Sequence, residues 1–332
     1  MFSKFKFQDK IFMQIFFIII IIIISLNITG CQNNNQNQNK NQKQQKLNPI
    51  VKETSDYCYT KMKTHINKLE KRYQTYIKKN TFWKSYYGRN LYQLKLGQGN
   101  KKVAVIGGVH GRENLTSLLI LKLLEDYVRH AKKSSNINNY DIRDLLNKAS
   151  IYFIPMLNPD GIEIAVKGIL NFDNKKFLIN ANQGQSSFKR WKANGRGVDL
   201  NKQFQADWKQ VESTSAPHYD SYKGPTPESE PESKALADLT RKLKFDMVVC
   251  FHHSGKVIYW YYKQKGANYQ RDYQLAKQIS AINGYEIIEP EESNTKAAGY
   301  KDWFIKKYNK PGFTIEIGKK ESLIWVFFYI FF

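Results

Sequence analysis

The chain has 332 residues, of which 42% are hydrophobic, enough for a sizeable core in one large domain or two small ones. Lys and Arg outnumber Asp and Glu by 52 to 29, and the net charge of +23 favours anionic partners such as acidic lipid, cell-wall polyanions, acidic peptides or nucleic acid. The lysines are scattered, and the chain has neither zinc-finger spacing nor an aromatic RNA-binding signature, so we expect no nucleic-acid partner. Three cysteines exclude a fold built on disulfides.

Residues 1–31 have the pattern of an export signal. Three lysines among the first ten residues precede an apolar run over residues 11–26, and the sequence Ile-Thr-Gly-Cys then ends at Cys31. This ending resembles a bacterial lipoprotein box, in which Cys31 becomes the lipidated N-terminus. An uncleaved signal anchor and plain secretion are the alternatives. All three predict an extracytoplasmic protein, and the first two attach it to a membrane.

Residues 32–51 are rich in Asn and Gln, and almost nothing in them is apolar before Leu47. Such a segment cannot repay the entropy of ordering, so we predict a disordered tether, with an aggregation-prone segment as the alternative. One catalytic domain is expected over residues 52–320, because no internal repeat or second linker interrupts it.

Strands and helices alternate along this domain. Short β-branched runs predict strands at 103–106, 151–156, 245–251, 256–262 and 312–317, and helical spacing predicts helices near 57–78, 115–128, 230–243, 269–282 and 300–308. This order indicates an α/β fold with a mixed, mostly parallel twisted sheet that helices cover on both faces. In such a sheet the functional site forms where strands end and loops begin.

Metal-binding residue types lie at two of these strand ends. His110 and Glu113 follow the strand at 103–106, and the pair His252-His253 follows the strand at 245–251. A hydrolytic zinc takes three protein ligands and keeps its fourth position for water, so these ends can supply one site. Taken alone, His110 and Glu113 are weak evidence, because two residues in this spacing are more often surface or helix-capping residues.

Seven motifs then occur in order: GGVHGRE, PMLNPDGIE, NGRGVDLNKQF, SEPES, FHHSGKVIYW, GYKDWF and PGFTIEIG. Together they resemble the A/B-type zinc carboxypeptidase family, and within it the bacterial branch that cuts γ-D-glutamyl-diaminopimelate bonds in murein peptides. The resemblance runs from Tyr57 to Gly318. It implies a monomeric metallopeptidase with one Zn²⁺ per chain, which acts on cell-wall peptides with free carboxylates.

The resemblance implies that His110, Glu113 and His253 bind the zinc. His253 is chosen over His252 because the family's histidine is followed by Ser, as at Ser254, and because only one of two adjacent strand residues can face the metal. His252 is then expected to be a core histidine or a support for the ligands.

Three further roles follow from the resemblance. Glu316 matches the general base and acid, which takes a proton from the zinc-bound water and returns it to the leaving amine. Asp199 matches the carboxylate that holds His110 in its metal-binding tautomer. A cation near this loop polarises the carbonyl, for which we favour Arg196 over Lys192 because a guanidinium offers two parallel donors. Either cation could instead face solvent.

Substrate contacts are implied at two places. Asn201 and Lys202 match the pair that grips the terminal carboxylate, where Lys202 replaces the usual Arg and gives a point charge in place of a two-pronged clamp. Tyr300 and Lys301 fall at the pocket for the leaving side, where Lys301 suits the carboxylate of diaminopimelate, unless it points to solvent. Asn294 stands where digestive relatives have a tyrosine.

The last residues depart from the family pattern. Relatives continue after Gly318 into a final helix, whereas residues 321–332 of this chain form an atypical, mostly apolar tail. We expect a truncated or altered end without the C-terminal helix, with a buried strand as the alternative. Two functions stay open: an active zinc amidase, or a catalytically impaired relative that binds peptides at the cell surface.

Overall fold

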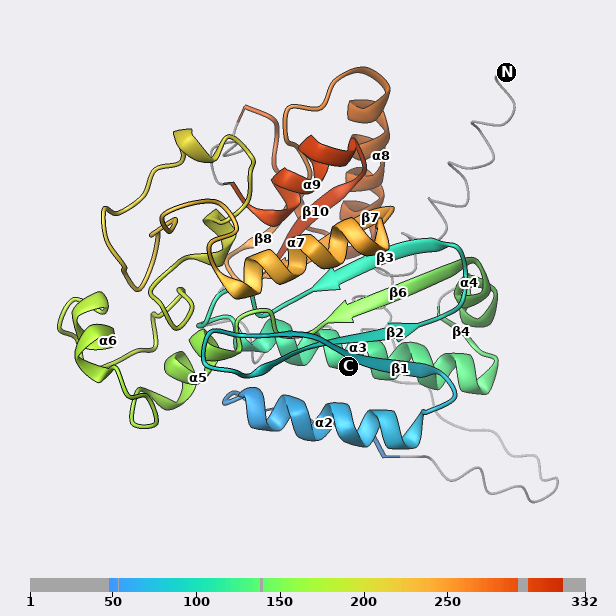
Figure 1. Cartoon of the computed structure of the whole chain (residues 1–332). Helices are drawn as coiled ribbons and strands as arrows, with labels where there is room; N and C mark the ends of the chain where they lie inside the picture. Colours follow the sequence, from blue (N-terminus) through green and yellow to red (C-terminus); the bar gives the residue numbers. More distant parts are fainter. Residues whose placement is uncertain (1–47, 53, 138–139, 292–297, 319–332) are drawn as a thin grey trace.

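The computed structural model describes residues 48–318 except for 53, 138–139 and 292–297 (Figure 1). The predictions for the signal, for most of the tether, for Asn294 and for the apolar tail therefore lie outside the described residues. Within the part that is described, no helix has both the length and the apolar character needed to cross a bilayer.

An eight-stranded sheet runs through the molecule in the order β1-β2-β6-β3-β7-β10-β8-β9. The strands are β1 Ile77–Lys84, β2 Asn90–Leu96, β3 Lys101–Ile106, β6 Ala149–Ile154, β7 Met247–His252, β8 Lys256–Tyr259, β9 Glu286–Ile287 and β10 Gly312–Ile317. The four central strands, β6, β3, β7 and β10, are parallel, while β1 and β2 pair antiparallel with their neighbours. On the other side, β8 pairs antiparallel with β10 and parallel with β9. A separate two-stranded ribbon pairs β4 Asn136–Ile137 with β5 Tyr140–Asp141.

Helices cover both faces of this sheet, which confirms the predicted α/β class. They are α2 Tyr59–Arg72, α3 Asn114–Lys133, α4 Ile142–Lys148, α5 Pro159–Lys167, α6 Lys175–Ala181, α7 Pro231–Leu243, α8 Gly266–Asn283 and α9 Tyr300–Tyr308, with short 3-10 turns at Leu200–Lys202 and Trp208–Gln210. All six residues of β6 and of β7 are buried, as expected for parallel strands with a helical layer on each side.

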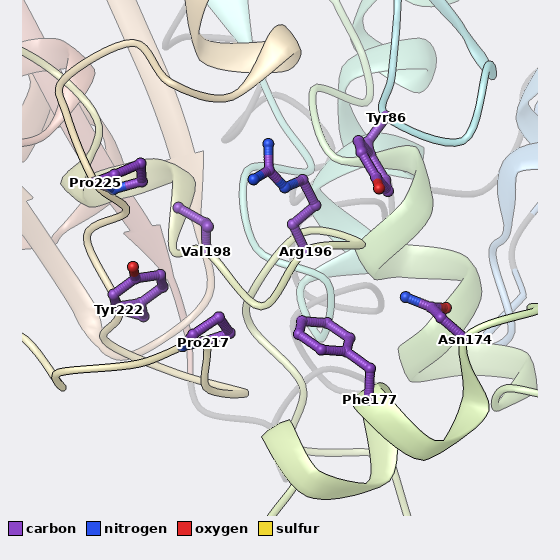
Figure 2. Close-up of a pocket in the computed structure, with 8 residues that line it drawn as sticks. All are labelled: Tyr86, Asn174, Phe177, Arg196, Val198, Pro217, Tyr222 and Pro225. Atoms are coloured by element: carbon purple, nitrogen blue, oxygen red, sulfur yellow. The ribbon is translucent and has the colours of Figure 1, made fainter.

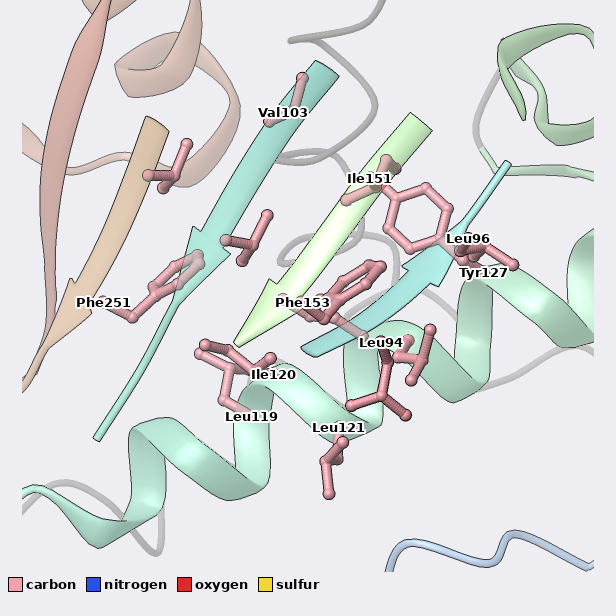
Figure 3. Packing of buried hydrophobic residues seen from close by; sticks show 14 of the residues in the cluster. Leu94, Leu96, Val103, Leu119, Ile120, Leu121, Tyr127, Ile151, Phe153 and Phe251 are labelled. Carbon is pink, nitrogen blue, oxygen red and sulfur yellow. The ribbon is translucent and has the colours of Figure 1, made fainter. Parts of the chain in front are cut away.

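Side-chain alternation divides the core into two layers. On one face, α2, α3, α4 and α8 pack on the sheet, and Figure 3 shows Leu119 and Ile120 of α3 beneath Phe153 of β6 and Phe251 of β7. On the other face, α7 and α9 cover Ala104, Ile106 and their neighbours. The candidate site lies at the carboxyl ends of the central strands, on this second face.

Two glycines allow α3 to start close to β3. A Cβ at Gly107 would lie 2.5 Å from Ile120 Cδ1 and 2.9 Å from the Thr116 carbonyl oxygen, so only a residue without a side chain fits there. Gly108 has a φ of 59°, a left-handed conformation that glycine adopts at little cost. The GGVHGRE sequence thus turns sharply and holds the residues after β3 at the sheet edge.

The folded part begins earlier than residue 52. Ile50 and Val51 are buried in the core, and their backbone N–H groups donate to the Glu125 carboxylate of α3 at 2.9–3.0 Å. The prediction of a disordered tether up to residue 51 is therefore wrong for its last residues, because two adjacent apolar side chains and one buried acceptor fix them.

Buried carboxylates hold the turn after β1 against α5 and α7. Asp160 accepts hydrogen bonds from Ser85 Oγ at 2.8 Å, the Tyr87 N–H at 2.9 Å and Arg89 Nη1 at 2.7 Å. Glu232, at the start of α7, accepts from the Tyr86 N–H at 2.9 Å. Burial and the nearby Asp160 charge raise the pKa of Glu232 to about 8.

This shift predicts a pH-dependent stability. The pKa of Glu232 is above its usual value of 4.5, so its contribution is fully present below about pH 4.5 and is lost as the pH rises through about 8. We expect the free energy of unfolding to fall by a few kcal/mol over this window. Denaturant titrations at pH 5–9 should show a shallower fall in Glu232→Gln, which has no proton to lose. Equal slopes in the two proteins would contradict the assignment.

Candidate active site

Three buried side chains meet at the carboxyl ends of β3 and β7. His110 Nδ1 lies 2.8 Å from Glu113 Oε1, His252 Nδ1 lies 3.2 Å from His110 Nδ1, and His252 Nδ1 lies 3.0 Å from Glu113 Oε2. The donor atoms of all three residues lie within 4.8 Å of one another. The loop after β3 supplies the first two residues, and the last position of β7 supplies the third.

This donor set fits a zinc ion. Ligands at 2.0–2.1 Å around a tetrahedral zinc lie about 3.3 Å apart, close to the separations seen here. Two imidazole nitrogens and a carboxylate form the set found in hydrolytic zinc sites. Although burial opposes charge on His110, Glu113 and Asp199 raise the pKa of its imidazole to about 10. The site therefore attracts positive charge.

The structure corrects the choice between the two adjacent histidines. His252, and not His253, joins His110 and Glu113. His252 is the register partner of Glu316 in the parallel pair of β7 and β10, so both side chains emerge on the same face of the sheet. His253 follows the last strand residue, and alternation directs it away from that face. The prediction of His253 as third ligand is therefore wrong.

Glu316 lies beside this group near the end of β10. Its Oε2 atom is buried and has no hydrogen-bond partner. Burial raises the pKa of this carboxyl, the charge of His252 lowers it, and Glu113 raises it further, with a net upward shift. A carboxylate with a free oxygen and a raised pKa can take up a proton in the site.

Asp199 lies on the other side of His110. Its Oδ1 lies 3.2 Å from His110 Nε2 and accepts a hydrogen bond from the Asn201 N–H at 2.9 Å. Burial alone would raise the pKa of Asp199, but His110 and Lys192 hold it well below its usual value. An ionised carboxylate at Nε2 leaves Nδ1 of His110 directed at Glu113 and His252.

The structure assigns different surroundings to the two candidate cations. The Lys192 carbonyl accepts a hydrogen bond from Gly111, next to His110, and the Lys192 charge acts on Asp199. Its Nζ lies 3.6 Å from Asp220 Oδ1. Lys192 is thus fixed beside the loop that carries His110 and Glu113.

Arg196 extends away from this loop. Its Nη1 lies 3.8 Å from Glu230 Oε1, and its guanidinium lies 5.3 Å from the centre of the Tyr86 ring. The side chain is 45% exposed and lines a separate pocket. The preference for Arg196 over Lys192 stays a prediction, but the contact of Arg196 with Glu230 at the start of α7 favours Lys192.

Two of the predicted substrate contacts have other partners. Lys202 Nζ donates to the Glu212 carbonyl at 3.0 Å on the surface. Tyr300 is buried, its hydroxyl lies 2.7 Å from Thr240 Oγ1, and its ring packs against Phe204. The expectation that Tyr300 lines a pocket is therefore wrong, because the residue belongs to the core between α7 and α9. Asn201 lies against Gly299, where an added Cβ would be 2.7 Å from its Oδ1.

Lys301 is buried, which excludes a solvent-facing side chain. Its Nζ donates to the Tyr261 carbonyl at 3.0 Å and pairs with Asp302. Burial raises the pKa of Cys250 to about 12, and the Lys301 charge opposes this rise, so the ammonium lies near that thiol.

The position of Cys250 in β7 shows where Lys301 lies relative to the candidate metal group. Cys250 is two residues before His252 in β7 and is the register partner of Thr314, two residues before Glu316 in β10. All four side chains share one face of the sheet. The Lys301 ammonium therefore lies near Cys250, on the face of the sheet that carries His252 and Glu316. The sequence analysis did not identify Cys250, Thr314 or Asp220 as residues near the site. Had His252 been chosen as the third ligand, the alternation of side chains along the strands would have pointed to Cys250 and Thr314.

A buried pair of imidazoles and a carboxylate, with a second carboxylate beside them at the ends of parallel strands, is the arrangement that a metal-dependent hydrolase requires. A model of the zinc carboxypeptidase family matches residues 62–332, and the chain belongs to this family. It is accordingly a metallocarboxypeptidase-type hydrolase of a zinc-dependent family.

Two bacterial relatives are about one-third identical to this chain over the aligned residues. The chain is 33% identical over 272 residues to gamma-D-glutamyl-L-diamino acid endopeptidase 1 of Lysinibacillus sphaericus, covering 81% of this chain and 67% of the relative. It is 32% identical to the uncharacterized protein YqgT of Bacillus subtilis, covering 72% of this chain and 64% of the relative. The chain thus spans about two thirds of the length of these relatives.

Solved structures agree on the fold. Thrombin activatable fibrinolysis inhibitor superposes with a TM-score of 0.65 at 21% identity, over 82% of this chain and 70% of the other. The carboxypeptidase A of Helicoverpa armigera gives a TM-score of 0.62 at 18% identity, over 82% of this chain and 68% of the other.

Proposed function

We propose that this protein is an exported zinc peptidase that hydrolyses γ-D-glutamyl bonds to a diamino acid in murein peptides. The observation that carries the proposal is the group of His110, Glu113 and His252 with Glu316 beside it. Lys301, which is buried on the same face and pairs with Asp302, offers donors to an additional carboxylate on the leaving group. The relative from Lysinibacillus sphaericus, whose name specifies a γ-D-glutamyl-L-diamino acid bond, supports the same substrate class. The signal pattern in residues 1–31 supports export.

His110, Glu113 and His252 would hold the zinc, which when bound acts as a Lewis acid and brings the pKa of a water to about 7. Asp199 fixes the His110 ring so that Nδ1 stays available. Glu316 accepts the proton of the attacking water at Oε2 and passes it to the departing amine nitrogen.

Binding of the substrate falls to the side chains around this group. Lys192, held by Asp220, places a positive charge beside the loop that carries His110 and can stabilise negative charge on the carbonyl oxygen. Asn201 offers an amide on the same loop. The presence of Glu316 and a complete ligand set favours the enzyme over the peptide-binding alternative.

A digest of labelled murein peptides tests the proposal. The purified chain should release the diamino product from an L-alanyl-γ-D-glutamyl-diaminopimelate peptide, and a zinc chelator should abolish the release. Mass analysis identifies the cleaved bond. Cleavage at another bond, or cleavage that persists after the zinc has been removed, would contradict the proposal.

Lys301 should determine the preference for the leaving group. A charge-assisted hydrogen bond contributes about 1.5–3 kcal/mol, so a peptide with Lys in place of diaminopimelate should be cut roughly 10–100-fold less efficiently. Lys301→Met should slow the diaminopimelate peptide and leave the Lys peptide nearly unchanged, as measured by kcat/KM. Lys306→Met, on the exposed side of α9, is the matched control. Equal turnover of the two peptides by the native enzyme would refute the carboxylate pocket.

A further inference from the structure

A cavity opens beside the candidate active site. It encloses about 400 Å³ and lies between the turn after β1, the start of α6 and two loops (Figure 2). Its lining consists of Tyr86, Asn174, Phe177, Arg196, Val198, Pro217, Tyr222 and Pro225. The volume and the mainly aromatic and apolar walls are those of a small-molecule site with a few polar groups.

This pocket shares a wall with the metal-binding loop. Val198 lines the pocket and directly precedes Asp199, which contacts His110. The Asp199 N–H donates to the Tyr222 carbonyl at 2.7 Å, so the two loops are joined at this point. The elements around Lys301, namely α9, β7 and β10, contribute none of the lining residues. The pocket therefore lies apart from Lys301, next to the loop that carries Asp199.

The walls offer flat apolar surfaces to a ligand. Tyr86 and Phe177 are 49% and 36% exposed, although large aromatic side chains are usually covered. Figure 2 shows their rings on one side of Arg196 and the ring of Tyr222 with Pro217 on the other. A ring-shaped ligand with C–H groups on its faces can pack between them.

The polar groups of the pocket are mainly donors. The Tyr87 hydroxyl donates to Asn174 Oδ1, so the Asn174 amide nitrogen stays available, and Figure 2 shows it directed toward the pocket. The Glu230 carboxylate lies 3.8 Å from Arg196 and balances its charge. Arg196 then offers N–H donors with little net charge, which favours neutral oxygen acceptors over an anion.

We propose that this pocket binds a sugar ring attached to the acyl side of the substrate. A pyranose presents C–H faces to aromatic rings and hydroxyl or amide oxygens at its edge, which matches these walls and these donors. This inference rests on the proposed function and adds to it. The enzyme would act on peptides that are still linked to glycan and would bind them more tightly than free peptides.

Phe177→Ala tests the proposal, and Ile179→Ala is its matched control. Both residues lie on α6 and are exposed, but only Phe177 lines the pocket. Binding is measured by calorimetry in the full chain carrying Glu316→Gln, which slows turnover, with a murein disaccharide-peptide and the same peptide without sugar. We expect the disaccharide-peptide to bind about tenfold more tightly, and Phe177→Ala to remove most of this difference. Ile179→Ala should keep it.

The experiment distinguishes a failure of the sugar pocket from a failure of the proposed function. Equal affinity for both peptides, or equal effects of Phe177→Ala and Ile179→Ala, would overturn the sugar pocket even if the enzyme cleaves the expected bond. A preserved difference in affinity with no cleavage by the native chain would support the pocket and refute the proposed reaction.

Discussion

Replacing His252 with alanine is expected to remove the zinc and reduce peptidase activity to the level of the chelated enzyme. His252 supplies one of three donor atoms, and it is the donor that ties β7 to the loop after β3. A site with only His110 and Glu113 lacks the third protein ligand that hydrolytic zinc requires. Because altered supporting residues already cost 10–100-fold in metal affinity, loss of a ligand should cost more.

His253→Ala is the matched control, since it changes the same residue type one position further along. It should retain about one zinc per chain and most of the activity. Metal analysis after dialysis, together with kcat/KM on a murein peptide, distinguishes the two variants. Retention of zinc in His252→Ala with loss in His253→Ala would restore the choice made from the sequence motif and contradict the strand register.

The sequence predicted the central strands and the long helices because their patterns are local. Gly312–Ile317 and Tyr300–Tyr308 appear with the predicted limits, since glycine, proline and the turn residues around them fix both ends. The hairpin of β1 and β2 was missed, because residues such as Lys78, Lys79 and Asn80 are poor strand formers that only pairing at the sheet edge makes extended. Tertiary context, absent from a local pattern, decided this segment.

The site was harder to predict where the role of a residue depends on the direction in which its side chain points. The identities of His110, Glu113 and Glu316 follow from motifs, but the choice between His252 and His253 depends on which residue pairs with Glu316. A shift of one residue in register exchanges the two faces of a strand. No feature of a single sequence reports that register.

The position of a charged side chain is equally hard to predict from the sequence, as Arg196 shows. Its guanidinium is the better partner for a carbonyl oxygen by chemistry alone, yet the turn at residues 194–198 directs it to Glu230. Lys192, two residues after Arg190, is placed beside His110 by a backbone hydrogen bond to Gly111. Backbone pairing across 81 residues therefore determined which cation lies near the metal-binding loop.

Glu316→Gln should lower kcat by about 10²–10⁴ while leaving the zinc in place, because the amide keeps the shape of the side chain but cannot accept the proton. The donor atoms of His110, Glu113 and His252 form the metal group without Glu316. KM should change little, since the lost interaction belongs to proton transfer and not to ground-state binding.

Thr314→Val gives a matched change on the same face of β10 and should leave kcat within about an order of magnitude. Zinc content and kcat are measured for both variants on the same peptide. If Glu316→Gln loses its zinc, Glu316 is a ligand and not the base. If it keeps both zinc and most of its kcat, another group moves the proton. Full zinc content together with a large fall in kcat supports the general base, because a base is required for the rate but not for metal binding.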